Sequence, residues 1–130
     1  MTVKDIALIS LKLLGHVNPQ GAVDENRESK YLNVAAACLD PIQLDLLDAE
    51  NNTTTANPLT TLTTVLSITD KTARQVAIYG LARDFSSLDG DSERFNLFSI
   101  KYENAKANIQ VDAPDITDVY GADFNLTFGG

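Results

Sequence analysis

Residues 68–109, ITDKTARQVAIYGLARDFSSLDGDSERFNLFSIKYENAKANI, decide the fold of this chain. Apolar residues recur in this stretch at steps of three and four, which is the spacing of an amphipathic helix. An acidic turn, Asp89-Gly90-Asp91, separates two such runs. A connection this short predicts that helices over 70–88 and 92–109 pack as an antiparallel hairpin. The apolar positions of the two runs are Ala73, Ala77, Leu81, Phe85 and Leu88, then Phe95, Phe98, Tyr102, Ala105 and Ile109.

Two residues of the first run carry further information. Thr69 stands directly before it, where a hydroxyl can accept a hydrogen bond from an early backbone N–H, so we expect it to cap the helix. Gly80 lies in the middle of the run, at a cost of about 1 kcal/mol relative to alanine. A glycine retained there predicts that another element packs closely against the helix.

The N-terminal half predicts two more helices. The first spans residues 3–17, with Thr2 and Asp5 at the spacing of a capping box. The second begins near Asp24. We expect a break or kink at Asp40, followed by a short helix through residue 47 or 48. Asp40 can cap this helix, Pro41 suits its first position, and Gln43 can close a capping box. The fold class is therefore mainly α, with a four-helix core.

Two segments lack this helical pattern. Residues 50–68 are rich in threonine and asparagine and predict a long irregular middle loop. Within it, apolar and polar residues alternate weakly over 62–68, so this part could pair as a strand. Residues 110–130 hold four aspartates and no lysine or arginine. We expect a helical domain over 1–109 and an extended acidic C-terminal arm over 110–130 that orders against a partner. The candidate partner-binding residues of this arm are Ile116, Val119, Tyr120, Phe124, Leu126 and Phe128.

Composition and charge exclude several classes of protein. A chain of 130 residues makes one domain, and its net charge of −8 argues against free-standing nucleic-acid binding. The apolar N-terminal stretch contains Lys4, Asp5 and Lys12, which suits neither a signal peptide nor a membrane-spanning helix. We therefore expect a soluble protein that is made in the cytosol and does not bind a membrane.

No motif predicts an enzyme, a cofactor or a metal. The single histidine, His16, lies at a helix end, and the single cysteine, Cys38, lies on an alanine-rich face, so neither indicates a catalytic centre. The acidic clusters are better explained as helix caps and a solvated helix face than as a site for a divalent cation. The basic residues are better explained as a solvated face than as a strip that binds nucleic acid. These groups are Asp89, Asp91 and Glu93; Asp40, Asp45 and Asp48; and Lys71, Arg74, Arg83 and Arg94.

Five short motifs occur in order along the chain. They are residues 32–33 (LN), 68–70 (ITD), 77–83 (AIYGLAR), 89–91 (DGD) and 101–103 (KYE), the last in a helix that also contains Phe98. In this order they resemble the small head–tail connector proteins of tailed bacteriophages, also called adaptor or head-completion proteins, over roughly residues 3–109. In that family an N-terminal helix and a Leu-Asn helix precede an "LA" helix, a short acidic turn and a helix with a "YE" pair.

The resemblance implies a structural role in the virion. Such proteins form a ring, commonly of twelve copies, beneath the portal of the filled capsid. The ring extends the DNA channel and docks the next neck or tail-completion protein. The implied partners are the portal protein, that neighbouring protein, further copies of the chain, and DNA that passes through the lumen without sequence-specific binding. By this resemblance the arm 110–130 would reach the portal and the loop 50–64 would face the lumen or the next ring.

Two other functions stay open on the residues alone. A small helical DNA-binding or regulatory protein of a phage or prophage could use short helices joined by turns. A metal-binding bundle or enzyme could use the scattered carboxylates, although the Glu-x-x-His pattern of such bundles is absent from the sequence.

Overall fold

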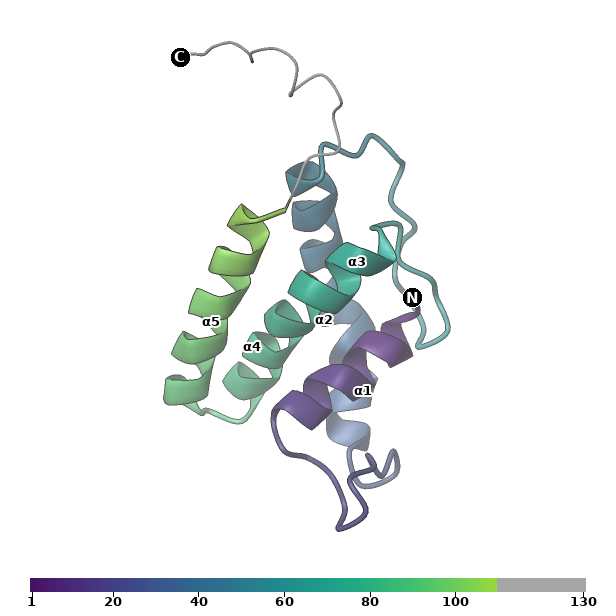
Figure 1. Ribbon diagram of the computed structural model, residues 1–130. Helices are drawn as coiled ribbons and strands as arrows, with labels where there is room; N and C mark the ends of the chain where they lie inside the picture. Colours follow the sequence, from purple (N-terminus) through teal and green to yellow (C-terminus); the bar gives the residue numbers. More distant parts are fainter. Residues whose placement is uncertain (110–130) are drawn as a thin grey trace.

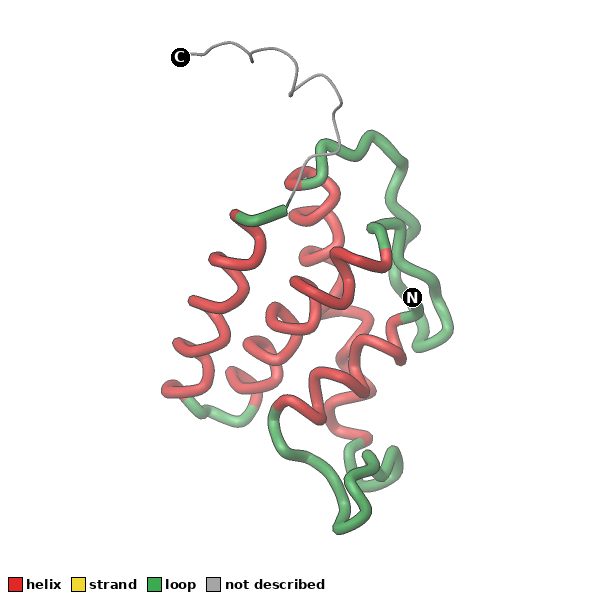
Figure 2. The backbone as a smooth tube through the Cα atoms, in the orientation of Figure 1, coloured by secondary structure: helices red, strands yellow, loops and turns green. Residues whose placement is uncertain are grey.

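The computed structural model describes residues 1–109, which form a mainly helical domain with a four-helix core, as predicted. Figure 1 shows α1 (Val3–Leu13) and α2 (Ser29–Ala49), a longer helical run, and α5 (Ser92–Ala107) at one edge. The longer run joins α3 (Asp70–Thr72), a π-helical segment η1 (Ala73–Ala77) and α4 (Ile78–Leu88). Within the described residues, Figure 2 shows helices and loops and no strand.

The predicted hairpin is confirmed, together with its caps, although Leu88 and Phe95 of the predicted apolar stripes are exposed. The Thr69 hydroxyl accepts a hydrogen bond from the backbone N–H of Thr72 at 3.2 Å and begins the first helical run. Asp91 accepts from the N–H of Arg94 at 3.0 Å and begins α5. Gly90 adopts a φ of +70° between them, which a residue with a side chain reaches only with strain. The acidic turn therefore ends one helix and caps the next.

The close packing predicted at Gly80 is also present. A Cβ atom placed on this glycine would lie 2.9 Å from Cε1 of Tyr102 on α5 and 3.0 Å from Cδ1 of Ile42 on α2. Tyr102 is itself fixed, because its hydroxyl donates to Oδ2 of Asp45 at 2.6 Å. Gly80 thus marks the point where α2, α4 and α5 meet.

The first helix begins as predicted and ends earlier. Thr2 and Asp5 form the capping box, with the Asp5 N–H donating to Thr2 at 3.1 Å and the Thr2 N–H donating to Asp5 at 3.0 Å. The predicted end at residue 17 is wrong, because α1 ends at Leu13. Gly15 adopts a φ of +80°, the left-handed conformation that terminates helices.

The predicted start of the second helix is wrong, and of the break or kink expected at Asp40 the break is absent. The helix begins at Ser29, because the Asp24 carboxylate accepts from the N–H groups of Asn26 and Arg27 and holds a separate turn. The helix then continues through Pro41 without the expected break. Proline in a helix interior costs about 3 kcal/mol. Three apolar side chains near Pro41, one before it and two after it, are fully or almost fully buried. Their packing offsets the cost of the proline and keeps the helix continuous. They are Leu39, Ile42 and Leu46.

The middle loop packs against the helices at several points. The Asp40 carboxylate does not cap a new helix but accepts from the N–H of Leu59 at 3.2 Å. Gln43, which is fully buried, binds both branches of the loop: its Nε2 donates to the carbonyl of Asn57 at 2.8 Å, and its Oε1 accepts from the N–H of Ser67 at 2.7 Å. The loop also inserts three apolar side chains into the core. They belong to Leu59, Leu66 and Ile68.

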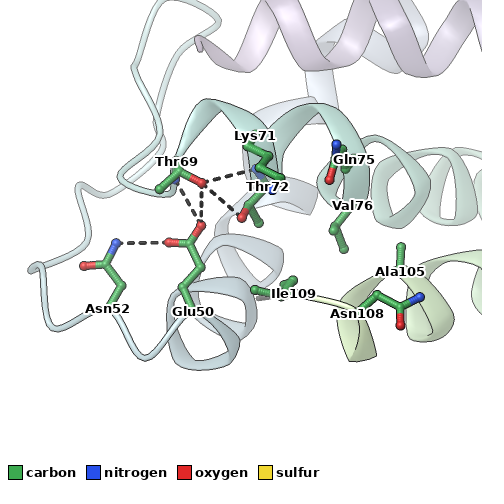
Figure 3. A pocket seen from close by; sticks show the side chains of 10 residues that line it. All are labelled: Glu50, Asn52, Thr69, Lys71, Thr72, Gln75, Val76, Ala105, Asn108 and Ile109. Atoms are coloured by element: carbon green, nitrogen blue, oxygen red, sulfur yellow. Dashed lines mark hydrogen bonds between the residues drawn. The ribbon is translucent and has the colours of Figure 1, made fainter. Parts of the chain in front are cut away.

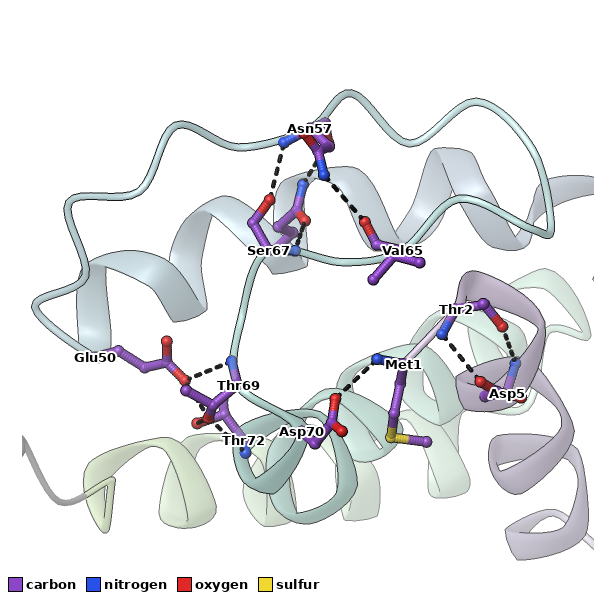
Figure 4. A network of polar contacts seen from close by, with 11 residues as sticks. Met1, Thr2, Asp5, Glu50, Asn57, Val65, Ser67, Thr69, Asp70 and Thr72 are labelled. Atoms are coloured by element: carbon purple, nitrogen blue, oxygen red, sulfur yellow. Dashed lines mark hydrogen bonds and ion pairs between the residues drawn. The ribbon is translucent and has the colours of Figure 1, made fainter.

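The strand predicted over residues 62–68 reduces to one isolated antiparallel bridge, between Thr2 and Val65. Leu66 donates its N–H to the carbonyl of Met1 at 3.0 Å, and Val3 donates to that of Thr64 at the same distance. Figure 4 shows this segment beside the start of α1. The end of the loop, just before α3, therefore pairs with the first three residues of the chain and does not form a sheet.

Candidate functional site

The candidate site is a groove of about 650 Å³ at one end of the bundle, between the end of α2, the start of the α3–η1 run and the end of α5. Figure 3 shows side chains from all three elements around it. Its lining residues are Glu50, Asn52, Thr69, Lys71, Thr72, Gln75, Val76, Ala105, Asn108 and Ile109.

One wall of the groove is the π-helical segment η1. Gln75 and Val76 of this segment both line the groove. π-Helical turns are rare and are frequent at functional sites. Opposite this wall, Ala105 and Ile109 of the α5 end add apolar surface. The amides of Gln75 and Asn108 make no side-chain hydrogen bond to another described residue, so both are available to a ligand.

The acidic end of the groove is already committed to internal contacts. Glu50 accepts from Nδ2 of Asn52 at 3.0 Å, and from the N–H and the hydroxyl of Thr69 at 3.2 and 2.8 Å (Figure 3). Burial raises the pKa of this carboxyl, but the polar groups of Thr72, Asn52 and Thr69 outweigh it and leave the pKa below its usual value. Lys71 has no carboxylate partner within 4 Å among residues 1–109 and is the one cation of the lining.

The chemistry of the lining suits recognition of a polypeptide. It offers amides and hydroxyls for a backbone, an ammonium group for a carboxylate, and aliphatic side chains for an apolar residue. Within residues 1–109, no three or more His, Cys, Asp or Glu side chains gather closely enough to hold a metal ion.

A polar network connects this region to the start of the chain. The Met1 ammonium group lies 2.8 Å from Oδ1 of Asp70, the first residue of α3, as Figure 4 shows. This contact lowers the pKa of the Asp70 carboxyl, first through the hydrogen bond and then through the positive charge. Thr69, the preceding residue, binds Glu50. The starts of α1 and α3 and the end of α2 are thus tied together beside the groove.

A second surface feature is the outer side of α5. This helix buries Phe98 and Tyr102 against α4 and α2. Its outer side carries Leu97 and Ile100, whose exposed fractions are 49% and 61%. A surface helix of a monomer is ordinarily polar on its outer side, and Leu97 and Ile100 depart from that pattern among exposed residues of α5 that are mostly polar or charged.

The structure separates the residues that the sequence raised as candidates. Ile116, Val119, Tyr120, Phe124, Leu126 and Phe128, the predicted partner-binding set, lie outside the described residues. Nδ1 of His16 lies 3.2 Å from Oε1 of the buried Glu28, and its ring contacts Tyr31. Cys38 is partly buried, and burial raises the pKa of its thiol.

The charged groups singled out in the sequence are dispersed. Asp89 accepts from Lys30 and Tyr31 of α2 at 2.9 and 2.8 Å, so it links two helices in addition to ending one. Arg83 pairs with Asp84 at 3.1 Å, as expected, but the two side chains are only 22% and 26% exposed, so they do not form a solvated face. The basic residues do not act as one strip, since Arg94 donates to the carbonyl of Leu14 on the α1 side at 2.7 Å. Of these residues, only Lys71 lines the groove.

Sequence reasoning placed Gln43 in a capping box with Asp40, which is wrong because Gln43 binds the loop instead, and it missed the groove. A glutamine inside an apolar helical stripe is a signal that a buried polar partner exists, but its partners lie 14 and 24 residues away. The groove has no signal in the sequence, because three elements far apart in the chain line it.

The chain matches no protein-family model, and comparisons with curated proteins and with solved structures likewise give no match. None of the helices in the described part of the chain has the length and apolar character needed to cross a bilayer.

Proposed function

We propose that this chain is a structural virion protein, a head–tail connector that assembles as a ring under the capsid portal and has no enzymatic role. The ring, of twelve copies, extends the DNA channel without sequence-specific DNA binding. It docks the next neck or tail-completion protein on its far side. The protein acts in the neck of the virion, between capsid and tail.

The observation that carries this proposal is the outer side of α5. Leu97 and Ile100 are one helical turn apart and about half or more exposed, while the same helix buries Phe98 and Tyr102. Burying the exposed part of such side chains stabilises an assembly by about 1 kcal/mol each. An edge helix that exposes two neighbouring aliphatic side chains is therefore suited to a neighbouring copy in a ring.

The hairpin supports the same proposal. The two segments that carry the resemblance to connectors, 77–83 and 101–103, lie in contact, because Gly80 of the first packs on Tyr102 of the second. The shared residues thus belong to one packing unit of the fold. Charge is also consistent with a channel wall, since residues 1–109 carry a net charge of −4 and would not retain passing DNA.

The ring contact is tested by co-expressing the full chain with the portal protein encoded in the same genome and imaging the complex by electron microscopy. We expect a ring on the portal for the natural chain and none for Leu97→Glu/Ile100→Glu. The matched control is Leu44→Glu on α2, which changes a side chain of 56% exposure and should leave the ring intact. Rings that survive the α5 double change would remove α5 as the contact.

The arm is tested by deleting residues 110–130. We expect portal association to be lost while the helical circular-dichroism signal of the remaining domain is unchanged. Retained association would show that the candidate residues Ile116, Val119, Tyr120, Phe124, Leu126 and Phe128 do not hold the portal. Salt-dependent gel shifts of DNA by the isolated chain would instead favour the DNA-binding or regulatory role.

A further inference from the structure

We propose that the groove at the end of the bundle is the docking site for residues 111–119 of the same chain, VDAPDITDV. This inference does not rest on the connector role. It assigns an occupant to the groove in the isolated chain. Ile116 and Val119 belong to this segment, so portal binding through these two residues would require the segment to leave the groove, whereas the candidates from Tyr120 onward lie outside it.

The position of the groove is the first argument. Asn108 and Ile109 line it, and Ile109 is the last described residue, so the next 21 residues of the chain start at the groove itself. A segment joined directly to its binding site is present at an effective concentration in the millimolar range. Weak individual contacts are then sufficient for occupancy.

The chemistry of the two partners is the second argument. Residues 110–130 carry a charge of −4 without any cation, and the groove presents Lys71, which has no carboxylate partner within 4 Å among the described residues. Glu50 also lines the groove and remains a carboxylate, so the attraction is local to the ammonium group of Lys71 rather than a property of the whole lining. The segment 111–119 carries aspartates at 112, 115 and 118, which supply three candidate carboxylates for Lys71.

The groove also offers what the rest of such a segment requires. Val76, Ala105 and Ile109 form apolar surface for Val111 or Ile116. The side-chain amides of Gln75 and Asn108 can donate to and accept from an extended backbone, which is how grooves bind peptides of varied sequence. The π-helical turn positions the first of these amides along the wall.

The test is disulfide trapping in the full-length chain with Cys38→Ala as background. One cysteine replaces Gln75 in the groove and one replaces Thr117, beside the apolar Ile116. On mild oxidation we expect a cross-link within one chain, seen as a monomer of altered mobility and confirmed by mass spectrometry of the linked peptides. Its rate should not depend on protein concentration.

The matched control pairs Thr117→Cys with Lys12→Cys. Lys12 is exposed near the end of α1, which lies beside the α4–α5 turn and away from the end of α5 (Figure 1). We expect the Gln75 pair to form at least about tenfold faster, as proximity at a binding site implies. Equal rates would overturn the proposal. Cross-links formed only between chains would assign the groove to a second copy and overturn it equally.

Charge is tested in the same background. Lys71→Glu should slow the Gln75–Thr117 cross-link several-fold, whereas Lys12→Glu, an equal change of charge far from the groove, should not. If both changes have the same effect, the ammonium group of Lys71 does not recognise the segment. Because every measurement uses the isolated chain, its outcome is independent of whether the protein binds a portal.

Discussion

Gln43 provides the sharpest test of how this fold holds its long middle loop. The side chain is fully buried on α2 and makes two hydrogen bonds, to Asn57 and to Ser67. Gln43→Leu keeps similar volume and removes both bonds, leaving a backbone carbonyl and an N–H without these partners. Each lost partner costs about 1–2 kcal/mol, so we expect the free energy of unfolding to fall by about 2–4 kcal/mol. The melting temperature should fall by about 10 °C.

Gln43→Glu separates the two bonds by pH. The introduced carboxylate still accepts a hydrogen bond from the N–H of Ser67. Its other oxygen, however, faces the carbonyl oxygen of Asn57, which repels it, and its negative charge is buried. Burial and that carbonyl raise the pKa of the introduced Glu above its unfolded value of about 4.3. The variant is therefore closest to the natural protein below pH 4, where the protonated acid donates to Asn57. It loses stability as pH rises through the folded-state pKa.

The assay is urea unfolding of both variants and the natural protein between pH 4 and pH 7. Gln20→Glu, at an exposed position, is the control for an added carboxylate and should show no such divergence. A stability difference between Gln43→Glu and the natural protein that stays constant over this pH range would refute the reasoning. Equal stability of Gln43→Leu and the natural protein would do so as well.

Three other predictions concern the helix contacts. Gly80→Ala should lower stability by about 1 kcal/mol in urea unfolding, because the strain of a Cβ at 2.9 Å from Tyr102 exceeds the gain in helix propensity. Tyr102→Phe should cost about 1–2 kcal/mol at pH 7. Burial raises the pKa of Asp45, but the hydrogen bonds from Tyr102 and Lys106 outweigh burial and leave the pKa below its usual value. The destabilisation by Tyr102→Phe should therefore shrink in the same assay as pH falls below about 4 and Asp45 becomes protonated. Burial, followed by the hydrogen bond to Asp89, raises the pKa of Tyr31 to about 12. The free energy of unfolding should therefore decline above about pH 10, where the tyrosine of the unfolded chain ionises. Urea unfolding at pH 9 and 11 should show a smaller decline for Tyr31→Phe.

Local interactions explain why parts of this fold could be predicted. The capping residues Thr2 and Thr69 act on N–H groups three residues away, so their effect is visible in the sequence. The hairpin follows from two helical stripes and a turn too short for any other connection. Gly80 is informative about a non-local contact instead. Glycine is unfavourable inside a helix, so its presence there indicates that side chains of other elements, here Tyr102 and Ile42, occupy the space of its missing side chain.

Non-local interactions account for the errors. Asp40 and Pro41 carry the signals of a new helix, yet α2 continues because the core side chains around them are buried by other elements. The threonine-rich loop has no pattern of its own, and its path depends on Gln43 and on bridges to the first residues of the chain. Propensity acts over one turn, whereas burial sums over the whole domain and prevails where the two conflict.

The amino-acid sequence alone determined a mainly helical domain over residues 1–109, the hairpin and its caps, and the change of composition at residue 110. Only the tertiary structure decided that the loop packs on α2 through Gln43, and that the ends of α2 and α5 and the start of the π-helical run enclose a groove. The physical reason is distance along the chain. Caps and stripes act between near neighbours, but a groove exists only after segments 20 to 60 residues apart have been packed side by side.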